Sequence, residues 1–132
     1  MKPRVGILLA QIVLMGIMVP GSPAVHAQKL IAGSYTQQSG EALYKGICQG
    51  CHMPDAKGAI GAGAYPALAN NARLMSALYP IAVVLNGQRA MPPFGAELSD
   101  TQIANVINYI REHFGNHYQD TVSAAAVNAA RR

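Results

Sequence analysis

The feature that most constrains this chain of 132 residues is the pentapeptide Cys48-Gln49-Gly50-Cys51-His52. It contains both cysteines of the chain, so a framework of several disulfides is excluded as a source of stability. Two thiols three positions apart, with an imidazole directly after the second, form a compact set of sulfur and nitrogen groups. Thiols and an imidazole held so close together indicate that this short segment binds a metal or a cofactor.

Two thiols at this spacing near a helix end can add to the two vinyl groups of haem and form two thioether bonds. The histidine that follows then lies beneath the iron and becomes its proximal ligand. The motif therefore predicts one covalently attached haem c as cofactor, with Cys48 and Cys51 as attachment points and His52 as a ligand of the iron.

Three other interpretations of the motif compete with haem. A redox dithiol of thioredoxin type requires a strand before the motif and a parallel sheet, which the sequence pattern does not show. A zinc site requires further ligands, and only His113 and His117 follow the motif as histidines. A disulfide between the two cysteines would close a very small loop and add little stability. We therefore favour haem.

Length and composition favour one small, mainly helical domain. With 51% apolar and 12% charged residues, the chain is too apolar for disorder and too short for a large α/β enzyme or a repeat array. Short helices joined by long loops bury little surface, and a bound cofactor would complete the core. The formal charge of +4 is spread along the chain without a basic run, which argues against a nucleic-acid partner.

The first 27 residues have the pattern of a secretory signal peptide. Lys2 and Arg4 precede an apolar stretch over Val5–Val19, and small residues precede a cleavage site after Ala27. An uncleaved membrane anchor is the alternative, but this stretch is shorter than the ~20 residues that span hydrocarbon. We expect residues 1–27 to be removed on export to the periplasm, which lowers the formal charge from +4 to +2.

Periodicity and capping residues predict the elements of the mature chain. Ser99 and Gln102 form a capping box, and Leu98 precedes it at the position of a hydrophobic staple. The helix that follows has apolar positions at helical spacing until Gly115, namely Ile103, Val106, Ile107 and Ile110. Before this helix we predict a flexible leader over 28–38, a helix over Ser39–Ile47 and a glycine-rich loop over Gly58–Ala64. A helical turn follows, from a cap at Asn70 or Asn71 through Met75. A further helix over Ile81–Leu85 begins near Pro80 and stops at Asn86-Gly87.

Five residues are candidates for the second axial ligand of the iron: Met53, Met75, Met91, His113 and His117. Met53 directly follows the proximal histidine and cannot reach the opposite face. Met75 lies in a helical apolar segment, where methionine usually fills the core. His113 and His117 lie at the polar end of the last helix, where we expect them to be solvated. Met91 precedes two prolines in a loop, and these restrict the backbone to extended conformations. We therefore assign Met91 as axial ligand; the alternative is a loop methionine packed on the haem edge.

These residues make the chain similar to the class I cytochromes c, a resemblance that covers Gln38–Asn116. The shared motifs are Gly40 and Tyr44 before the haem motif, Tyr65-Pro66-Ala67-Leu68, Met91-Pro92-Pro93-Phe94, and Tyr109 on the last helix. The resemblance implies an all-α class I cytochrome c fold, in which about four short helices and long loops surround one haem. The domain would span 39–116 and be followed by a tail over 117–132.

The same resemblance implies a contact behind the proximal ligand. In this family the carbonyl of the matching proline, here Pro66, accepts the imidazole N–H of the ligating histidine, which orients the ring. The chain departs from the family directly after His52, where it has Met53 instead of the frequent Gly or Ala.

More narrowly, three segments resemble the small cytochrome subunits or partners of periplasmic bacterial dehydrogenases, namely Tyr65–Ala69, Val84–Gly87 and Leu98–Ile103. The resemblance implies a redox partner that receives electrons from such a dehydrogenase and passes them to an oxidase or another cytochrome of the respiratory chain. Contact with a membrane would occur only through a partner or an uncleaved signal segment. The pattern is compatible with a free shuttle and with an obligate subunit.

Electron transfer is favoured over catalysis, because the sequence contains no recognisable acid pair and no nucleophile with a base. The alternative is a ligand-binding or peroxidatic haem protein, which requires an open or labile sixth position, and Met91 separates the two. Arg89 either pairs with a haem propionate or is a solvated loop cation. With two propionates the mature chain is near neutral, so we expect docking through a partly apolar rim at the haem edge.

Overall fold

The computed structural model describes residues 35–61 and 63–131. The predicted signal peptide, 1–27, and residues 28–34 of the predicted leader lie outside the described residues. The described part is mainly helical with one two-stranded sheet, which confirms the expected all-α class. None of the helices in this part is long and apolar enough to cross a membrane.

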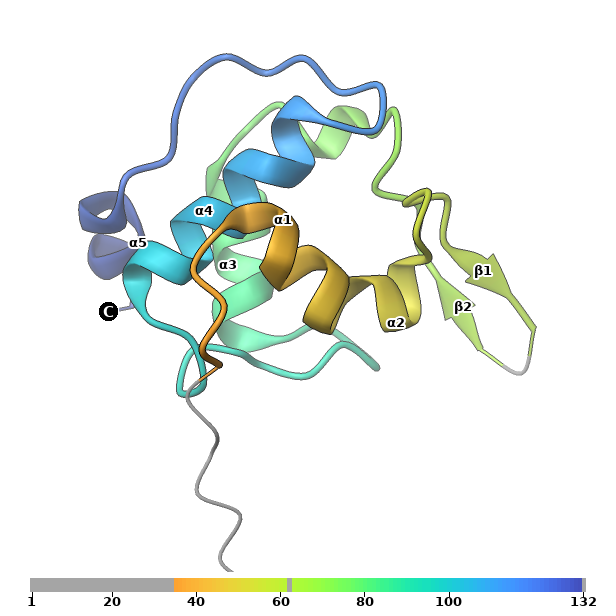
Figure 1. Ribbon diagram of the computed structural model, residues 1–132, viewed down its shortest axis with the longest axis horizontal. Coiled ribbons are helices and arrows are strands. Elements are labelled where there is room, and N and C mark those ends of the chain that lie inside the picture. Colours follow the sequence, from red (N-terminus) through yellow and green to blue (C-terminus); the bar gives the residue numbers. More distant parts are fainter. Residues whose placement is uncertain (1–34, 62, 132) are drawn as a thin grey trace, which may run out of the picture.

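Helix α4, Asp100–Glu112, lies at the centre of the fold and begins at the predicted capping box (Figure 1). The Ser99 hydroxyl accepts from the Gln102 backbone N–H at 3.2 Å, and the Ser99 N–H donates to the Gln102 side chain at 2.9 Å. The four predicted core positions are each at most 5% exposed: Ile103, Val106, Ile107 and Ile110. The prediction of this helix is confirmed.

The end of the predicted leader is bound to α4. The Gln102 amide donates to the carbonyls of Tyr35 and Gln37 at 2.6 and 2.8 Å, and the Asn105 amide donates to that of Gln38 at 2.8 Å. Residues 35–38 have no regular secondary structure, but these hydrogen bonds hold them in place. Over these four residues the structure therefore differs from the expected flexible leader.

The first helix begins at Ser39, whose hydroxyl accepts a backbone hydrogen bond at 3.2 Å. It consists of α1, Gly40–Leu43, a π-helical section η1, Tyr44–Cys48, and α2, Gln49–His52. It thus continues to His52 and does not end at Ile47 as predicted, because backbone hydrogen bonds run on without a break through η1 and α2. A Cβ at Gly40 would lie 2.2 Å from the Asn105 carbonyl oxygen, so glycine allows α1 to pack closely on α4.

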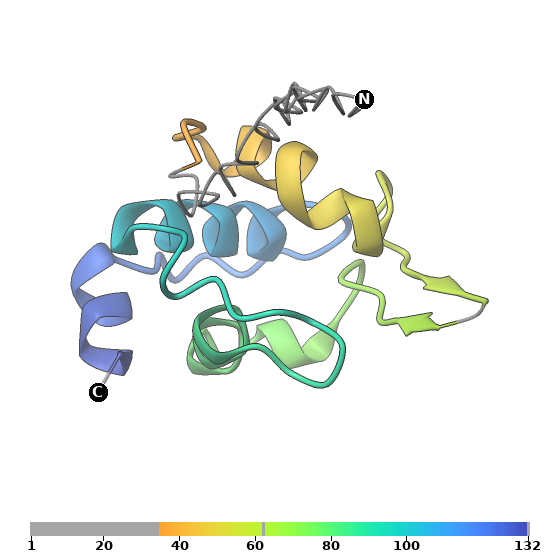
Figure 2. The same ribbon diagram turned by 90° about the horizontal axis from the view of Figure 1, so that it is seen from below.

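The 3-10 helix η2, Ala72–Leu74, and α3, Leu78–Asn86, lie on the other side of α4 from the first helix (Figure 2). Asn71 caps η2 by accepting from the Arg73 N–H at 3.0 Å, as predicted. Helix α3 starts at Leu78, before the predicted start at Ile81, and ends at Asn86 with Gly87 as its C-cap. Gly87 has a φ of 73°, the left-handed stop expected from the Asn-Gly pair.

The segment Gly58–Ala64 was predicted to be a loop, and the structure corrects this. It contains β1, Ala59–Ile60, which pairs antiparallel with β2, Ala64–Tyr65. Strands of two residues are too short to produce an alternating pattern, so periodicity could not identify them. The hairpin projects from the helical body (Figure 1), and Ile60 at its end is 95% exposed.

The C-terminal segment forms a further helix, α5, Ala124–Ala130, for which the sequence analysis expected only a tail. Ser123 caps it, and Val127 is fully buried where α5 packs against α3 and α4. Before α5, the Asn108 side chain bonds both backbone groups of Val122, at 2.8 and 3.0 Å. The chain beyond α4 is therefore an integral part of the core.

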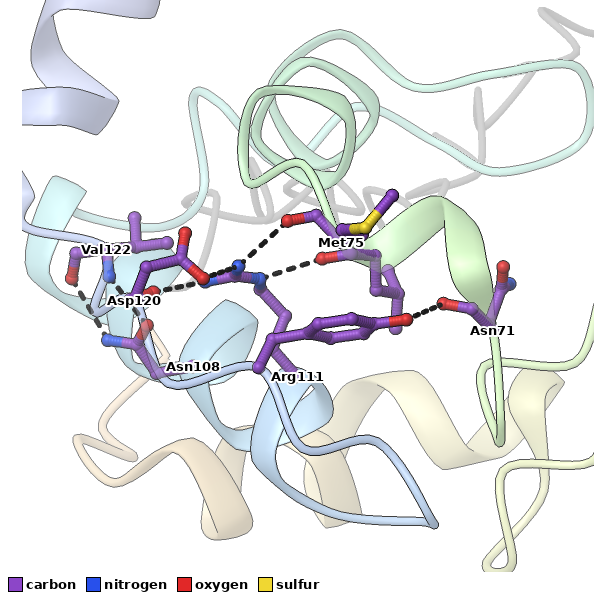
Figure 3. A network of polar contacts seen from close by, with 8 residues as sticks. Asn71, Met75, Asn108, Arg111, Asp120 and Val122 are labelled. Carbon is purple, nitrogen blue, oxygen red and sulfur yellow. Dashed lines mark hydrogen bonds and ion pairs between the residues drawn. The ribbon is translucent and has the colours of Figure 1, made fainter.

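Arg111 is fully buried and connects three parts of the chain (Figure 3). Its guanidinium donates to the carbonyls of Leu74 and Met75 at 2.9 and 3.1 Å, and one Nη lies 2.5 Å from the carboxylate of Asp120. Met75 closes η2 with its carbonyl facing Arg111, and its side chain is 67% exposed. The expectation that Met75 fills the core is therefore wrong.

Candidate haem-binding site

One cavity of about 1240 Å³ brings all six predicted site residues together. They are Cys48, Cys51 and His52 on the first helix, Pro66 after β2, and Arg89 and Met91 on the loop after α3. In Figure 2, the first helix starts above α4 and descends beside it, and the loop 87–95, drawn in blue-green, lies below α4. The cavity exceeds the roughly 300–1,000 Å³ of common small-molecule sites, so it offers room for a macrocycle.

The two cysteines are free thiols three positions apart on a helix, and therefore on the same side of it. Burial, together with the neighbouring Cys51, raises the pKa of Cys48 to about 12. Cys48 is thus a neutral thiol, whereas a redox dithiol depends on a low-pKa thiolate. The only sheet in the described part of the chain is a two-stranded antiparallel one, so the thioredoxin interpretation finds no support in the fold.

His52 ends α2 and is only 8% exposed. Its Nδ1 atom lies 2.9 Å from the carbonyl oxygen of Pro66. Because a carbonyl can only accept, Nδ1 is the donor of this hydrogen bond, and in the neutral imidazole this tautomer leaves the lone pair on Nε2. An imidazole in this state, held by a second hydrogen bond, has the form that a metal ligand requires.

In the described part of the chain, three residues between His52 and Pro66 have a positive φ, namely Met53, Ala56 and Gly58. The first and the last of these make contacts that set the path of the chain. Met53 has a φ of 66° and a ψ of 159°, a conformation that favours glycine, and its carbonyl accepts from the Tyr44 hydroxyl at 2.7 Å. Gly58 has a φ of 68°, and a Cβ there would lie 2.1 Å from the Tyr65 carbonyl oxygen. The chain carrying Pro66 can reach the imidazole because position 58 is glycine.

The methionine loop, 87–95, is held by backbone hydrogen bonds at both ends. Gln88 and Met91 exchange two N–H···O bonds of 3.0 Å, and the Phe94 N–H donates to a carbonyl of α3 at 2.9 Å. A Cβ at Gly87 would lie 2.6 Å from the Met91 carbonyl oxygen, so the tight start of the loop requires glycine. Met91 is half-buried and lines the cavity.

Arg89 occupies the turn before Met91 with a φ of 55°, and its exposed side chain lines the cavity. Lys57 and Arg73 line the same cavity, and the described lining residues include no Asp or Glu. Neither of these cations could be assigned to the site from the sequence, because they lie far from Arg89 in the chain and carry no local motif. The cavity is therefore apolar with a positive rim, which suits a ligand with an apolar body and anionic groups.

The residues set aside as axial ligands lie elsewhere. His113 and His117 are exposed, as expected, and neither these histidines nor Met75 lines the cavity. Within residues 35–61 and 63–131, no three His, Cys, Asp or Glu side chains form a group that could hold a metal ion, so the zinc interpretation finds no ligand set there.

A helix that carries Cys-x-x-Cys-His into an apolar cavity is the attachment geometry of c-type cytochromes, and this is the class that fold and site define. Residues 36–110 match the family described as Cytochrome C oxidase, cbb3-type, subunit III, and the chain belongs to this family of cytochrome c domains. Membership implies haem, and Cys48 and Cys51 fit its attachment motif.

Several known proteins are similar to this chain. The fructose dehydrogenase cytochrome subunit of Gluconobacter japonicus is 38% identical over 107 residues, covering 70% of this chain and 22% of that subunit. The gluconate 2-dehydrogenase cytochrome c subunit of Pantoea cypripedii is 32% identical, covering 72% of this chain and 24% of that subunit. Cytochrome c6 of Diacronema lutheri is 35% identical, covering 58% of this chain and 95% of that protein. The chain thus spans about a quarter or less of the two dehydrogenase subunits.

Proposed function

We propose that this chain is a periplasmic one-electron carrier. Cys48 and Cys51 bind one haem c through thioethers, and His52 and Met91 are the axial ligands of its iron. The observation that supports this most directly is the shared cavity, which the motif residues line from the first helix and Met91 from the loop after α3. These two segments are far apart in sequence, and both line the same cavity.

The bound haem supplies a reversible Fe(III)/Fe(II) couple. The thioether of Met91 is a weak, soft donor that favours Fe(II) and raises the potential relative to two histidine ligands. His52, oriented by the Pro66 carbonyl, supplies a stronger donor in a fixed direction. The largely apolar lining limits water around the site, and ligation by Met91 occupies the position that oxygen or peroxide chemistry needs. Electron transfer therefore suits this arrangement better than ligand binding.

The electron donor in this proposal is a periplasmic dehydrogenase. Support comes from the relatives named as cytochrome subunits of fructose and gluconate dehydrogenases. The acceptor is an oxidase or another cytochrome of the respiratory chain. The exposed Ile60 and Tyr65 border the cavity, which provides the partly apolar rim that brief redox encounters use.

The test is to express the full chain in a bacterium that assembles c-type haem and to isolate the periplasmic fraction. We expect the mass of residues 28–132 plus one haem, oxidised and reduced spectra of a six-coordinate cytochrome, and no binding of carbon monoxide. A mass equal to the bare polypeptide would overturn covalent attachment. Stoichiometric carbon monoxide binding by the wild type would instead support the ligand-binding or peroxidatic alternative.

A further inference from the structure

We propose that Arg131, directly after α5, is a positioning residue for the methionine loop and, through it, for Met91. The inference rests on the function proposed above, in which Met91 is an iron ligand. Arg131 lies beyond residues 36–110, the part that matches the family model. The proposal therefore assigns a role to the C-terminal helix that the family match does not cover.

The guanidinium of Arg131 contacts three acceptors between the methionine loop and α4. It donates to the carbonyl of Gly95 and, at 2.9 Å, to the carbonyl of Leu98. Its Nε lies 2.5 Å from the carboxylate of Asp100, the first residue of α4. The side chains of this ion pair are 29% and 24% exposed, so solvent screens the contact only partly. One side chain thus holds the segment 95–100 at three points.

The same segment is bound to α3 on its other side. The Gly95 N–H donates to the Leu85 carbonyl at 3.2 Å. A Cβ at Gly95 would lie 2.8 Å from that Leu85 oxygen and 3.4 Å from an Nη of Arg131. Gly95 is therefore packed between the end of α3 and the guanidinium, and its peptide groups are bound from both directions.

The connection from Gly95 back to Met91 is short and stiff. Pro92 and Pro93 have fixed φ angles, which leaves few torsions to absorb a movement. Phe94 packs against the core and lines the cavity. A displacement of Gly95 away from α3 would consequently be transmitted to Met91.

Helix α5 is itself firmly placed. Val127 is fully buried, and the Asn128 amide donates to the second carboxylate oxygen of Asp100 at 2.9 Å. Hydrogen bonds from Arg131 and Asn128 hold the pKa of Asp100 below its usual value, which favours the charged carboxylate that pairs with Arg131. Figure 2 shows α5 beside the start of α4, where these contacts are made. Arg131 thus connects the methionine loop to a fixed support.

The test uses the full-length holoproteins of the wild type, Arg131→Gln and Arg131→Lys. Each ferric protein is titrated with imidazole, which competes with a thioether for the iron, and the sulfur–iron charge-transfer band is followed. We expect Arg131→Gln to keep the haem but to bind imidazole about tenfold more tightly, the effect of losing roughly one charge-assisted hydrogen bond. Arg131→Lys should be intermediate, because a compact ammonium can pair with Asp100 but lacks the planar fork with which the guanidinium contacts the separate carbonyls.

Leu43→Ala is the control for a general loss of stability. Leu43 is the last residue of α1, which packs against α4; it is fully buried and does not line the cavity. We expect it to lower the melting temperature without changing the imidazole affinity. The positioning role is overturned if Arg131→Gln binds imidazole as weakly as the wild type, or if Leu43→Ala raises the affinity equally. A wild type without the sulfur–iron band would overturn the assignment of Met91 and this inference together.

Discussion

The Nδ1 atom of His52 lies 2.9 Å from the carbonyl oxygen of Pro66, fourteen residues later in the chain. The close approach depends on Gly58, whose left-handed φ of 68° and missing side chain let the backbone at Tyr65 pack against it. Because the imidazole orientation is set by a backbone carbonyl, no side-chain substitution at position 66 removes the acceptor directly. The geometry of the proposed proximal ligand is therefore determined by the path of the main chain.

Replacing Met91 by alanine tests the axial ligand. We expect Met91→Ala to abolish the sulfur–iron charge-transfer band, lower the midpoint potential and let the ferrous protein bind carbon monoxide, because the soft donor is lost and a coordination site opens. The free energy of unfolding should fall by roughly 2 kcal/mol, the lower end of the range for a buried methionine, since Met91 is half-buried. Visible spectra, redox titration and thermal unfolding provide the measurements.

Met75→Leu is the matched control for this substitution. Met75 is 67% exposed and does not line the cavity, so spectrum, potential and stability should all stay unchanged. Loss of the band in Met75→Leu, with the band retained in Met91→Ala, would show that the ligand assignment is wrong.

Replacing Arg89 by glutamine tests whether the cations that line the cavity influence the midpoint potential of the haem. A cation close to a propionate favours the reduced iron, so Arg89→Gln should lower the midpoint potential by roughly 20–60 mV, where 59 mV corresponds to a tenfold change for one electron. Lys45→Gln is the control, because Lys45 pairs with Glu41 at the surface and does not line the cavity. Equal potentials for the wild type and Arg89→Gln would identify Arg89 as a solvated loop cation.

Met53 provides a test of backbone strain. Its φ of 66° and ψ of 159° belong to a region that is costly for any residue other than glycine. Glycine relieves this strain but gives the unfolded chain more conformational freedom, which offsets part of the gain. We expect Met53→Gly to stabilise the ferric protein by a net of about 1 kcal/mol. This gain corresponds to a rise in melting temperature of about 4–8 °C. Met53→Ala shortens the side chain without relieving the strain, so it should bring no gain. A lower melting temperature for Met53→Gly would refute this account.

Replacing Arg111 tests how much its buried hydrogen bonds contribute to the stability of the fold. Arg111→Met would leave the buried carbonyl of Leu74 and the partly buried carbonyl of Met75 without their donor, at a cost of roughly 2–4 kcal/mol in the free energy of unfolding. Asp120→Asn should have little effect, because the Asp120 side chain is 71% exposed and solvent can replace the contact. Urea unfolding of both variants measures the difference. Equal destabilisation by the two variants would mean that the ion pair, and not the carbonyl contacts, is the important interaction.

Features that depend on neighbours in the chain could be predicted. The capping box at Ser99 and Gln102 and the stop at Gly87 are formed by residues within a few positions of one another, and both occur in the structure. The haem motif is equally local, because helical spacing alone brings Cys48 and Cys51 to one side. For such features the sequence and elementary geometry were sufficient.

Other features depend on which distant segments meet, and these were missed or mispredicted. Met75 was expected in the core, but Arg111, thirty-six residues later, binds its carbonyl and the side chain lies outside. The hairpin at 59–65 is too short to leave a periodic signal. Helix α5 carries mostly alanine, and Val127 becomes a core residue only because α5 packs against α3 and α4.

The sequence by itself determined that the chain carries a haem-attachment motif on a helix, and where its strongest helix begins, because those properties arise between residues a few positions apart. Only the tertiary structure decided that Lys57 and Arg73 join Arg89 around one cavity, and that Arg131 reaches the methionine loop. The physical reason is that burial and long-range hydrogen bonds depend on the packing of the whole chain, and residues far apart in sequence leave no local pattern that records their contact.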